Sequence, residues 1–233
     1  KEHGYSRHLY EFKDEYANMP VDVQKDEEKG LYYVQKEKKR LYFRKSTPAK
    51  KIQKYYRALS MEQDRRSPHH YFNSVKEVTG KVFVDVGCAE GYSSLEIIEE
   101  AKHVYLFEQD EQWLEAIRAT FEPWQDKVTI VQKYVSDHNS SREQTLDDFF
   151  NNQTNEHLFL KMDIEGAERH ALAGCNNLFQ NCQKLDFAIC TYHLRDDEEV
   201  ISAFLDKHNC TYINQKGFFR HKIRSVVMRG SKK

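Results

Sequence analysis

Hydrophobic and polar positions follow a repeating pattern from Lys81 onward. Short apolar runs alternate with segments in which apolar residues recur every three or four positions, which predicts buried strands alternating with amphipathic helices. The expected strands are 82–86, 103–108, 128–132, 158–163, 185–190, 210–214 and 222–229. The expected helices are 92–101, 110–121, 143–150, 166–175 and 196–208. Asp110 is the expected N-cap of the second helix.

This alternation predicts an α/β fold with a Rossmann-like, doubly wound and mostly parallel sheet. Right-handed crossovers bring the carboxyl ends of the strands to one edge of such a sheet. Ligands bind at that edge, close to the point where the strand order reverses. We therefore look for functional residues at the strand ends.

The front of the chain has a different pattern, and we expect a domain boundary near residue 75. Residues 1–20 are polar with scattered aromatic residues and predict an N-terminal arm. The division gives a basic, aromatic-rich extension over 1–75, expected to bind a ligand or to mediate oligomerisation, and an α/β domain over 76–233.

Two aromatic, β-prone runs within the extension, 31–34 and 41–43, predict a β-hairpin with a polar turn. Thr47 and Pro48 predict a helix start, with Thr47 as the N-cap and Pro48 at the first helical position. Apolar residues then recur at helical spacing as far as Leu59.

Charge is unevenly distributed along the chain. Residues 25–66 contain 14 Lys/Arg and 6 Asp/Glu, a net charge of +8, so the remainder carries −9 of the total of −1. The basic segment suggests contact with an anionic acceptor, and a solvated charged helix face is the alternative.

Because no apolar run approaches about 18 residues, we expect no membrane span. Five cysteines without a C-x-x-C pair favour a reducing, cytoplasmic location and argue against a cysteine zinc site.

A glycine-rich loop, 87–91, follows the strand 82–86. Its glycines allow a tight turn close to a ligand, and the following helix start offers free N–H groups. Dinucleotide sites have the pattern G-x-G-x-x-G, whereas this loop has two glycines four positions apart and Glu90 between them. A carboxylate there repels a pyrophosphate and suits a cationic ligand, which favours S-adenosylmethionine over NAD. Glu108, at the end of the second strand, is suited to ribose hydroxyls.

Three motifs together resemble a known family. The segment 85–91 with Glu108 is similar to the cofactor half of class I S-adenosylmethionine-dependent methyltransferases. Residues 160–168, Leu-Lys-Met-Asp-Ile-Glu-Gly-Ala-Glu, resemble the K-x-D-x-E-G signature of the FkbM-type methyltransferases. Residues 189–193, followed by the acidic pair 196–197, are similar to the Tyr-His segment of that family.

The resemblance covers about residues 68–229 and implies a seven-stranded sheet with the last strand antiparallel. It also implies methylation of a hydroxyl group, often on a sugar or a glycosylated natural product. The residues that it assigns to the cofactor are Asp85, Gly87, Glu90, Gly91, Glu108, Ser136 and Asp163. The two glycines would face the methionine part, and Glu90 or Asp85 would bind its ammonium group. The segment 135–137 would border the adenine.

Methyl transfer to a hydroxyl group requires in-line alignment and removal of a proton. The candidate catalytic residues are His193, Asp163 and Lys161, with His193 as the general base because its ordinary pKa is near neutrality. We expect Lys161 to form an ion pair with Asp163 or Glu165. The two acids, with His193, are also an alternative Mg²⁺ or Ca²⁺ site, which we do not favour. The segment 69–71, His-His-Tyr, is a candidate roof over the cofactor.

The leading function is O-methylation of a sugar, a glycan precursor or another small molecule. The alternatives are a nucleic-acid methyltransferase, suggested by the basic segment, and a non-catalytic S-adenosylmethionine-binding module. The segment 162–165, Met-Asp-Ile-Glu, argues against amino-group methylation of bases, which uses an Asn/Asp-Pro-Pro-aromatic motif. We therefore expect a small-molecule or glycan acceptor and no nucleic-acid partner, and the oligomeric state is left open.

Overall fold

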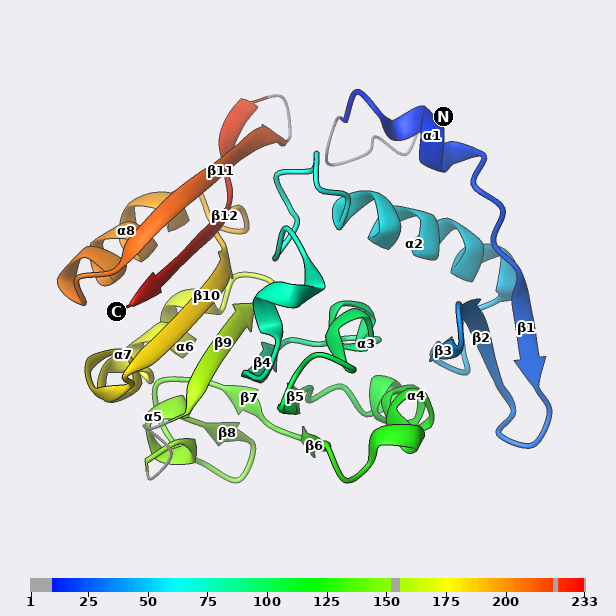
Figure 1. Ribbon diagram of the computed structural model, residues 1–233, viewed down its shortest axis with the longest axis horizontal. Helices are drawn as coiled ribbons and strands as arrows, with labels where there is room; N and C mark the ends of the chain where they lie inside the picture. The colour runs from blue at the N-terminus through cyan, green and yellow to red at the C-terminus, as the bar shows by residue number, and fades with distance from the viewer. Residues whose placement is uncertain (1–9, 152–155, 220–221, 233) are drawn as a thin grey trace.

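The computed structural model describes residues 10–151, 156–219 and 222–232 (Figure 1). A seven-stranded sheet forms its centre, in the order β11-β12-β10-β9-β4-β5-β6. The strands are β4 (Val82–Val86), β5 (His103–Phe107), β6 (Val128–Val131), β9 (His157–Met162), β10 (Lys184–Cys190), β11 (Thr211–Phe219) and β12 (Lys222–Lys232). Neighbouring strands from β10 to β6 pair in parallel, and β12 pairs antiparallel with both β10 and β11. The predicted α/β fold and the reversed last strand are confirmed.

Six helices accompany this sheet in the described part of the chain. They are α3 (Tyr92–Ile97), α4 (Glu111–Phe121), α5 (Leu146–Phe149), α6 (Glu168–Ala173), α7 (Asn176–Asn181) and α8 (Asp197–Lys207). Asp110 caps α4 as predicted, because its side chain accepts a hydrogen bond from the backbone N–H of Gln112.

The predicted helix 143–150 is only partly correct. Its first residues form β8 (Glu143–Gln144), which pairs with β7 (Tyr134–Val135), and Thr145 then caps the short helix α5. The partner of β8 is β7, nine positions earlier in the chain, and this pairing leaves no signal in the local periodicity. Helix α7 was not predicted.

The two faces of the sheet bury two separate hydrophobic clusters. Along β4, Phe83 points into the cluster beneath α3 and α4, whereas Val82 and Val84 point into the cluster beneath α5 to α8. This alternation follows from the two-residue period of a strand. A strand buried on both faces explains why the run 82–86 is almost wholly apolar.

The front of the chain forms α1 (Lys13–Ala17), a three-stranded antiparallel sheet and the long helix α2 (Ala49–Glu62). The sheet consists of β1 (Val23–Asp26), β2 (Leu31–Lys36) and β3 (Lys39–Tyr42). The predicted hairpin is therefore confirmed as β2 and β3, and β1 was not predicted. Thr47 is not the N-cap of α2: Pro48, with an extended ψ of 149°, takes this position, and its carbonyl accepts a hydrogen bond from Ile52 N. The helix thus begins one residue later than predicted.

The front segment packs over α3 and α4 and shares their hydrophobic cluster. Buried Leu41, Phe43 and Ile52 belong to the same cluster as Phe83 and Leu95. A short 3₁₀ helix, η1 (Val75–Val78), connects this segment to β4. The division into domains 1–75 and 76–233 stays a prediction. No helix in the described ranges has the length and apolar character needed to cross a bilayer.

Candidate functional site

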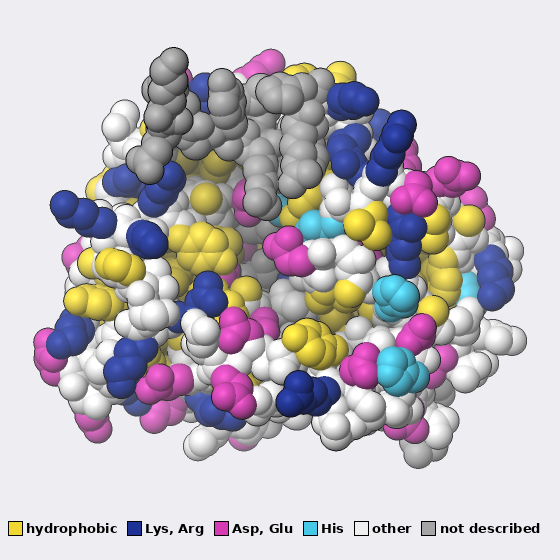
Figure 2. All heavy atoms as spheres, turned by 180° about the vertical axis from the view of Figure 1, so that it is seen from behind, with side chains coloured by type: hydrophobic (Ala, Val, Ile, Leu, Met, Phe, Trp, Pro, Cys, Tyr) yellow, Lys and Arg dark blue, Asp and Glu magenta, His cyan; other side chains and the backbone are white. Residues whose placement is uncertain are grey.

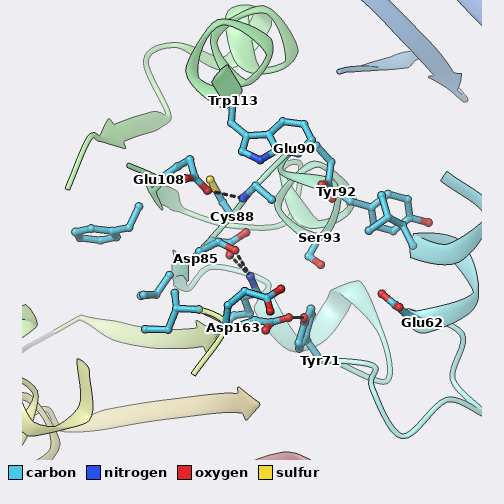
Figure 3. Close-up of a pocket in the computed structure, with 18 of the residues that line it drawn as sticks. Glu62, Tyr71, Asp85, Cys88, Glu90, Tyr92, Ser93, Glu108, Trp113 and Asp163 are labelled. Carbon is cyan, nitrogen blue, oxygen red and sulfur yellow. Dashed lines mark hydrogen bonds and ion pairs between the residues drawn. The ribbon is translucent and has the colours of Figure 1, made fainter. Parts of the chain in front are cut away.

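A large cavity, with a volume of about 1510 Å³, opens at the carboxyl ends of β4, β5 and β9. The loops that follow these strands form one wall, and α1, α2, His69 and Tyr71 form the opposite wall. Figure 3 shows the labelled side chains converging on this space from both sides. The front segment is therefore part of the site.

The glycine loop after β4 lies tightly against the end of β9. Gly87 and Gly91 have φ angles of 79° and 80°, in the left-handed region that favours glycine. A Cβ atom on Gly87 would lie 2.1 Å from the carbonyl oxygen of Asp163. The loop is also held by Glu108, whose Oε2 accepts a hydrogen bond from Ala89 N at 3.0 Å. Glu108 lines the cavity at the end of β5, and its role in ribose binding stays a prediction.

Lys161 does not pair with Asp163 or Glu165 as predicted. It lies in β9 directly opposite Asp85 of β4, and its Nζ is 2.7 Å from Asp85 Oδ1. It also donates a hydrogen bond to the carbonyl oxygen of Gly87. The expected ion pair was wrong because the cross-strand neighbour approaches Lys161 more closely than residues further along its own strand do.

Asp85 is almost completely buried, at 1% exposure. Its second oxygen, Oδ2, accepts a hydrogen bond from Ser94 Oγ at 2.6 Å. Both carboxylate oxygens thus have protein partners, which ties β4, β9 and α3 together at the base of the cavity. Of the two acids predicted to bind an ammonium group, Asp85 is the one already neutralised by a cation.

Glu90 is a buried carboxylate on the cavity wall, at 3% exposure. Burial raises its pKa to about 7, against the lowering effect of a hydrogen bond that Tyr55 Oη donates to it at 2.8 Å. No cationic nitrogen of the described residues forms an ion pair with it. A desolvated carboxylate of this kind favours a cationic partner. Tyr55, from α2, was missed because helical spacing made it look like an ordinary core residue.

Asp163 follows β9 and lies at the centre of a polar cluster. Tyr71 Oη donates a 2.7 Å hydrogen bond to its Oδ2, and His69 Nε2 lies 3.7 Å from the same oxygen. His193 Nε2 lies 3.4 Å from Oδ1. Burial raises the pKa of Asp163, but Lys161 and the two histidines outweigh burial and hold it below the ordinary value. Asp163 and His193 are therefore brought together as predicted.

His193 is not one of the described residues that line the cavity. Its Nδ1 lies 2.9 Å from an oxygen of Glu168, a fully buried side chain that the sequence did not single out. Glu165 is 83% exposed. Burial lowers the pKa of His193, but Glu168 and Asp163 reverse this and hold it above the ordinary value. His193 therefore contacts Asp163, which lines the cavity, without lining the cavity itself.

Two groups of side chains in the described ranges have the donor atoms to hold a metal ion. One is His69, Asp163 and Cys190, and the other is Asp163, Glu168 and His193. Neither group contains Glu165, which the sequence had offered as an alternative ligand.

The predicted roof at 69–71 is only partly formed. His69 and Tyr71 line the cavity, but His70 points away and contacts Ser67 O and Arg229 Nη1. At the other end, Ser136 lines the cavity after β7, in the segment predicted to border an adenine.

Basic side chains of the front segment lie at the rim. Lys13 and Lys54 are exposed and line the cavity, and Arg44 stacks over the ring of Trp113 with 4.1 Å from Cζ to the ring centroid. Figure 2 shows Lys and Arg side chains spread over the side of the molecule formed by the front segment.

Comparisons with known proteins agree with this geometry. A model of the FkbM methyltransferase domain matches residues 85–213, which is more than half of the chain. No curated protein matches the sequence. The matched range holds the glycine loop, Glu108, Asp163 and His193.

Two solved structures share the fold at low identity. The methyltransferase FkbM from Methylobacillus flagellatus KT has a TM-score of 0.53 and 16% identity, over 79% of this chain and 55% of that protein. Magnesium protoporphyrin IX methyltransferase from Synechocystis PCC 6803, with bound S-adenosylmethionine, has a TM-score of 0.51 and 13% identity, over 81% of this chain and 86% of that protein. This chain thus spans little more than half the length of the FkbM protein. Because the FkbM domain model matches more than half of the chain, including the strand ends that form the cavity, the chain belongs to the FkbM methyltransferase family.

Proposed function

We propose that the protein transfers the methyl group of S-adenosylmethionine to a hydroxyl oxygen of a small, sugar-like acceptor. The observation that carries this proposal is that one cavity holds both the glycine loop with Glu90 and the cluster around Asp163. The first part suits a cationic methyl donor, and the second suits a hydroxyl group. When bound, S-adenosylmethionine supplies an electrophilic methyl group on a sulfonium.

The donor half of the cavity fits this cofactor. Glu90 is a buried carboxylate without a cationic partner in the described chain, which suits the ammonium group of the methionine part. Glu108, on the cavity wall at the end of β5, binds the ribose hydroxyls in this proposal, and Trp113, over whose ring Arg44 stacks, lines the cavity as well. Gly87 and Gly91 leave the loop backbone open to the ligand.

The acceptor half is polar and aromatic. Tyr71 and Asp163 form one side, and Glu62 of α2 faces them across the cavity in Figure 3. Hydroxyl groups of a sugar can both donate to such carboxylates and accept from a phenol, and sugar faces pack on tyrosine rings. The exposed Lys13 and Lys54 at the rim favour an acceptor that carries an anionic group.

The predicted catalytic residues take separate roles in this proposal. Asp163 accepts a hydrogen bond from the acceptor hydroxyl and orients it. Lys161 neutralises Asp85 and fixes the glycine loop, which makes it a positioning residue. His193 holds Asp163 in place from behind the cavity wall. We expect no requirement for a metal ion, so methyl transfer should survive exhaustive chelation.

The test is methyl transfer from labelled S-adenosylmethionine to a panel of sugars, nucleotide sugars, glycolipids and a mixed RNA. We expect transfer to an anionic sugar derivative. Asp163→Asn should lower turnover at least about a hundredfold, as is typical when an orienting group is lost. Glu108→Ala should mainly weaken cofactor binding, by about tenfold, with turnover at saturation retained.

Calorimetry separates the possible outcomes. Failure to bind either S-adenosylmethionine or S-adenosylhomocysteine would refute the proposal, and binding without transfer to any acceptor would favour a non-catalytic module. Methyl transfer to RNA alone, with a steep dependence on salt concentration, would instead favour a nucleic-acid methyltransferase.

A further inference from the structure

We propose that His69, and not His193, is the general base that takes the proton from the acceptor, with Glu62 as the residue that orients it. This assignment deepens the proposed function and rests on it. It comes from the front segment, outside the range 85–213 that the family model matches.

His69 lies on the cavity wall between two carboxylates. Its Nδ1 is 3.7 Å from Glu62 Oε2, and its Nε2 is 3.7 Å from Asp163 Oδ2. One ring nitrogen thus faces each acid, and Nε2 also lies 3.6 Å from the buried Sγ of Cys190. An imidazolium formed here has a carboxylate on either side to stabilise its charge.

The ring of His69 is held in a defined orientation. It makes edge contacts with Tyr71 and Tyr192, with ring centroids 5.7 Å and 5.0 Å apart. Its backbone N–H donates a hydrogen bond to Ser67 Oγ, which fixes the turn that carries it. At 3% exposure the side chain is shielded from bulk water and still borders the cavity. A base must be positioned in this way to act on a bound hydroxyl.

The other candidates for the base are less suitable. His193 does not line the cavity, whereas His69 does, so an acceptor hydroxyl in the cavity has direct access to His69 alone of these two histidines. Asp163 has a pKa below its ordinary value and already accepts a hydrogen bond from Tyr71, so it is a weak proton acceptor. Burial lowers the pKa of His69, but Glu62 and Asp163 outweigh burial and the opposing charge of His193 and hold the pKa above its ordinary value.

Methyl transfer needs no reactant other than the acceptor, S-adenosylmethionine and His69. The acceptor O–H proton passes to His69 Nε2 while the acceptor oxygen forms a bond to the methyl carbon. The methyl–sulfur bond breaks, and its electron pair stays on the sulfur, which yields S-adenosylhomocysteine. His69 leaves the step as an imidazolium between Glu62 and Asp163 and returns its proton to water on product release.

A test that needs no acceptor uses histidine NMR on the full chain. The imidazole signals are assigned with His69→Gln and His193→Gln, and both pKa values are measured in complexes with S-adenosylhomocysteine and with S-adenosylmethionine. The two ligands differ in the positive charge on sulfur. Since a nearby positive charge disfavours the imidazolium, the pKa of His69 should be lower by about one unit in the S-adenosylmethionine complex. His193 should shift by less than half as much.

A pKa of His69 that is equal in the two complexes would overturn the assignment, as would a larger shift at His193. Glu62→Gln provides a second measurement without any ligand. It should lower the pKa of His69 while leaving that of His193 nearly unchanged, and no change at His69 would refute the orienting role of Glu62. If neither ligand binds, the proposed function itself fails. If both bind but the pKa of His69 is the same in the two complexes, only the assignment of His69 as the base fails.

Once an acceptor is known, the two glutamine variants form a matched pair. His69→Gln should lower turnover at least about a hundredfold and abolish the rise of kcat/KM with pH near neutrality, with S-adenosylhomocysteine affinity unchanged. His193→Gln should keep that rise with a smaller loss of turnover. The reverse pattern would restore His193 as the base.

Discussion

At the scale of single residues, the site keeps one acid paired and another unpaired. Asp85 is neutralised by Lys161 across two neighbouring strands, whereas Glu90, among the described residues, has the phenol of Tyr55 and no cation as its side-chain partner. The difference explains why burial raises the pKa of Glu90 to about 7. Such an acid destabilises the ligand-free protein when it ionises and binds a cation more strongly for the same reason.

Replacing Glu90 with Gln should stabilise the ligand-free protein at high pH. The pKa is raised from 4.5 to about 7 on folding, so the folded state holds a proton that the unfolded state loses, and stability falls as pH rises across this window. Gln cannot ionise and still accepts the Tyr55 hydrogen bond. Denaturant unfolding should show a gain on the order of 3 kcal/mol at pH 8 and almost none near pH 4.

The same substitution should weaken S-adenosylmethionine binding roughly tenfold or more, because it removes a charged hydrogen-bond partner. Glu115→Gln, on the exposed face of α4, is the matched control and should change neither quantity. If Glu90→Gln were neutral at pH 8, Glu90 would not be a desolvated carboxylate.

The identities of these residues were predictable, but their pairings were not. Glu90, Glu108 and Asp163 stand at loop and strand ends that the pattern locates. The partner of Lys161 depends on the register of β4 against β9, a contact between residues 76 positions apart in sequence. Judged only from residues close to it in sequence, Lys161 was expected to pair with Asp163 or Glu165.

At the scale of elements, the glycine loop needs glycine for close packing as well as for its positive φ angles. Its backbone at Gly87 presses against the carbonyl of Asp163, where β9 ends. Lys161 Nζ reinforces this contact through the Gly87 carbonyl oxygen. The donor half and the acceptor half of the cavity are thus joined by direct contact of two strand ends.

Gly87→Ala should therefore cost more stability than a positive φ angle alone explains. Gly80 also has a positive φ, of 72°, but a Cβ atom there meets nothing within 4 Å. We expect Gly80→Ala to cost about 1–2 kcal/mol from backbone strain. Gly87→Ala should cost more than about 3 kcal/mol, since a backbone oxygen cannot move aside as a side chain can. Equal losses in denaturant unfolding would contradict the close packing of this loop.

At the scale of the whole molecule, the front segment completes both the core and the site. Its buried Phe43 and Ile52 pack in the same cluster as the sheet, and its Tyr55, His69 and Tyr71 line the cavity. The sequence predicted a separate extension because composition and charge change near residue 75. Composition alone does not tell whether two segments share a core.

A fragment of residues 76–233 should therefore lose cooperative unfolding. Without the front segment, apolar side chains of α3 and α4, such as Leu95 and Trp113, are exposed to water. Circular dichroism on heating should show a broad transition, or aggregation, where the full chain shows a sharp one. A fragment with a sharp transition near that of the full chain would establish 76–233 as an independent domain.

The sequence by itself determined the α/β fold, the seven strands and the glycine loop, because strand burial and tight turns leave short-range signals in residue type and spacing. It also placed Glu108 and Asp163 at strand ends. Only the tertiary structure decided that Lys161 pairs with Asp85, that Glu168 holds His193, and that Tyr55 and Glu62 of α2 line the cavity. Those contacts join residues far apart in the chain, and their geometry depends on strand register and on how the front segment packs, which no local pattern encodes.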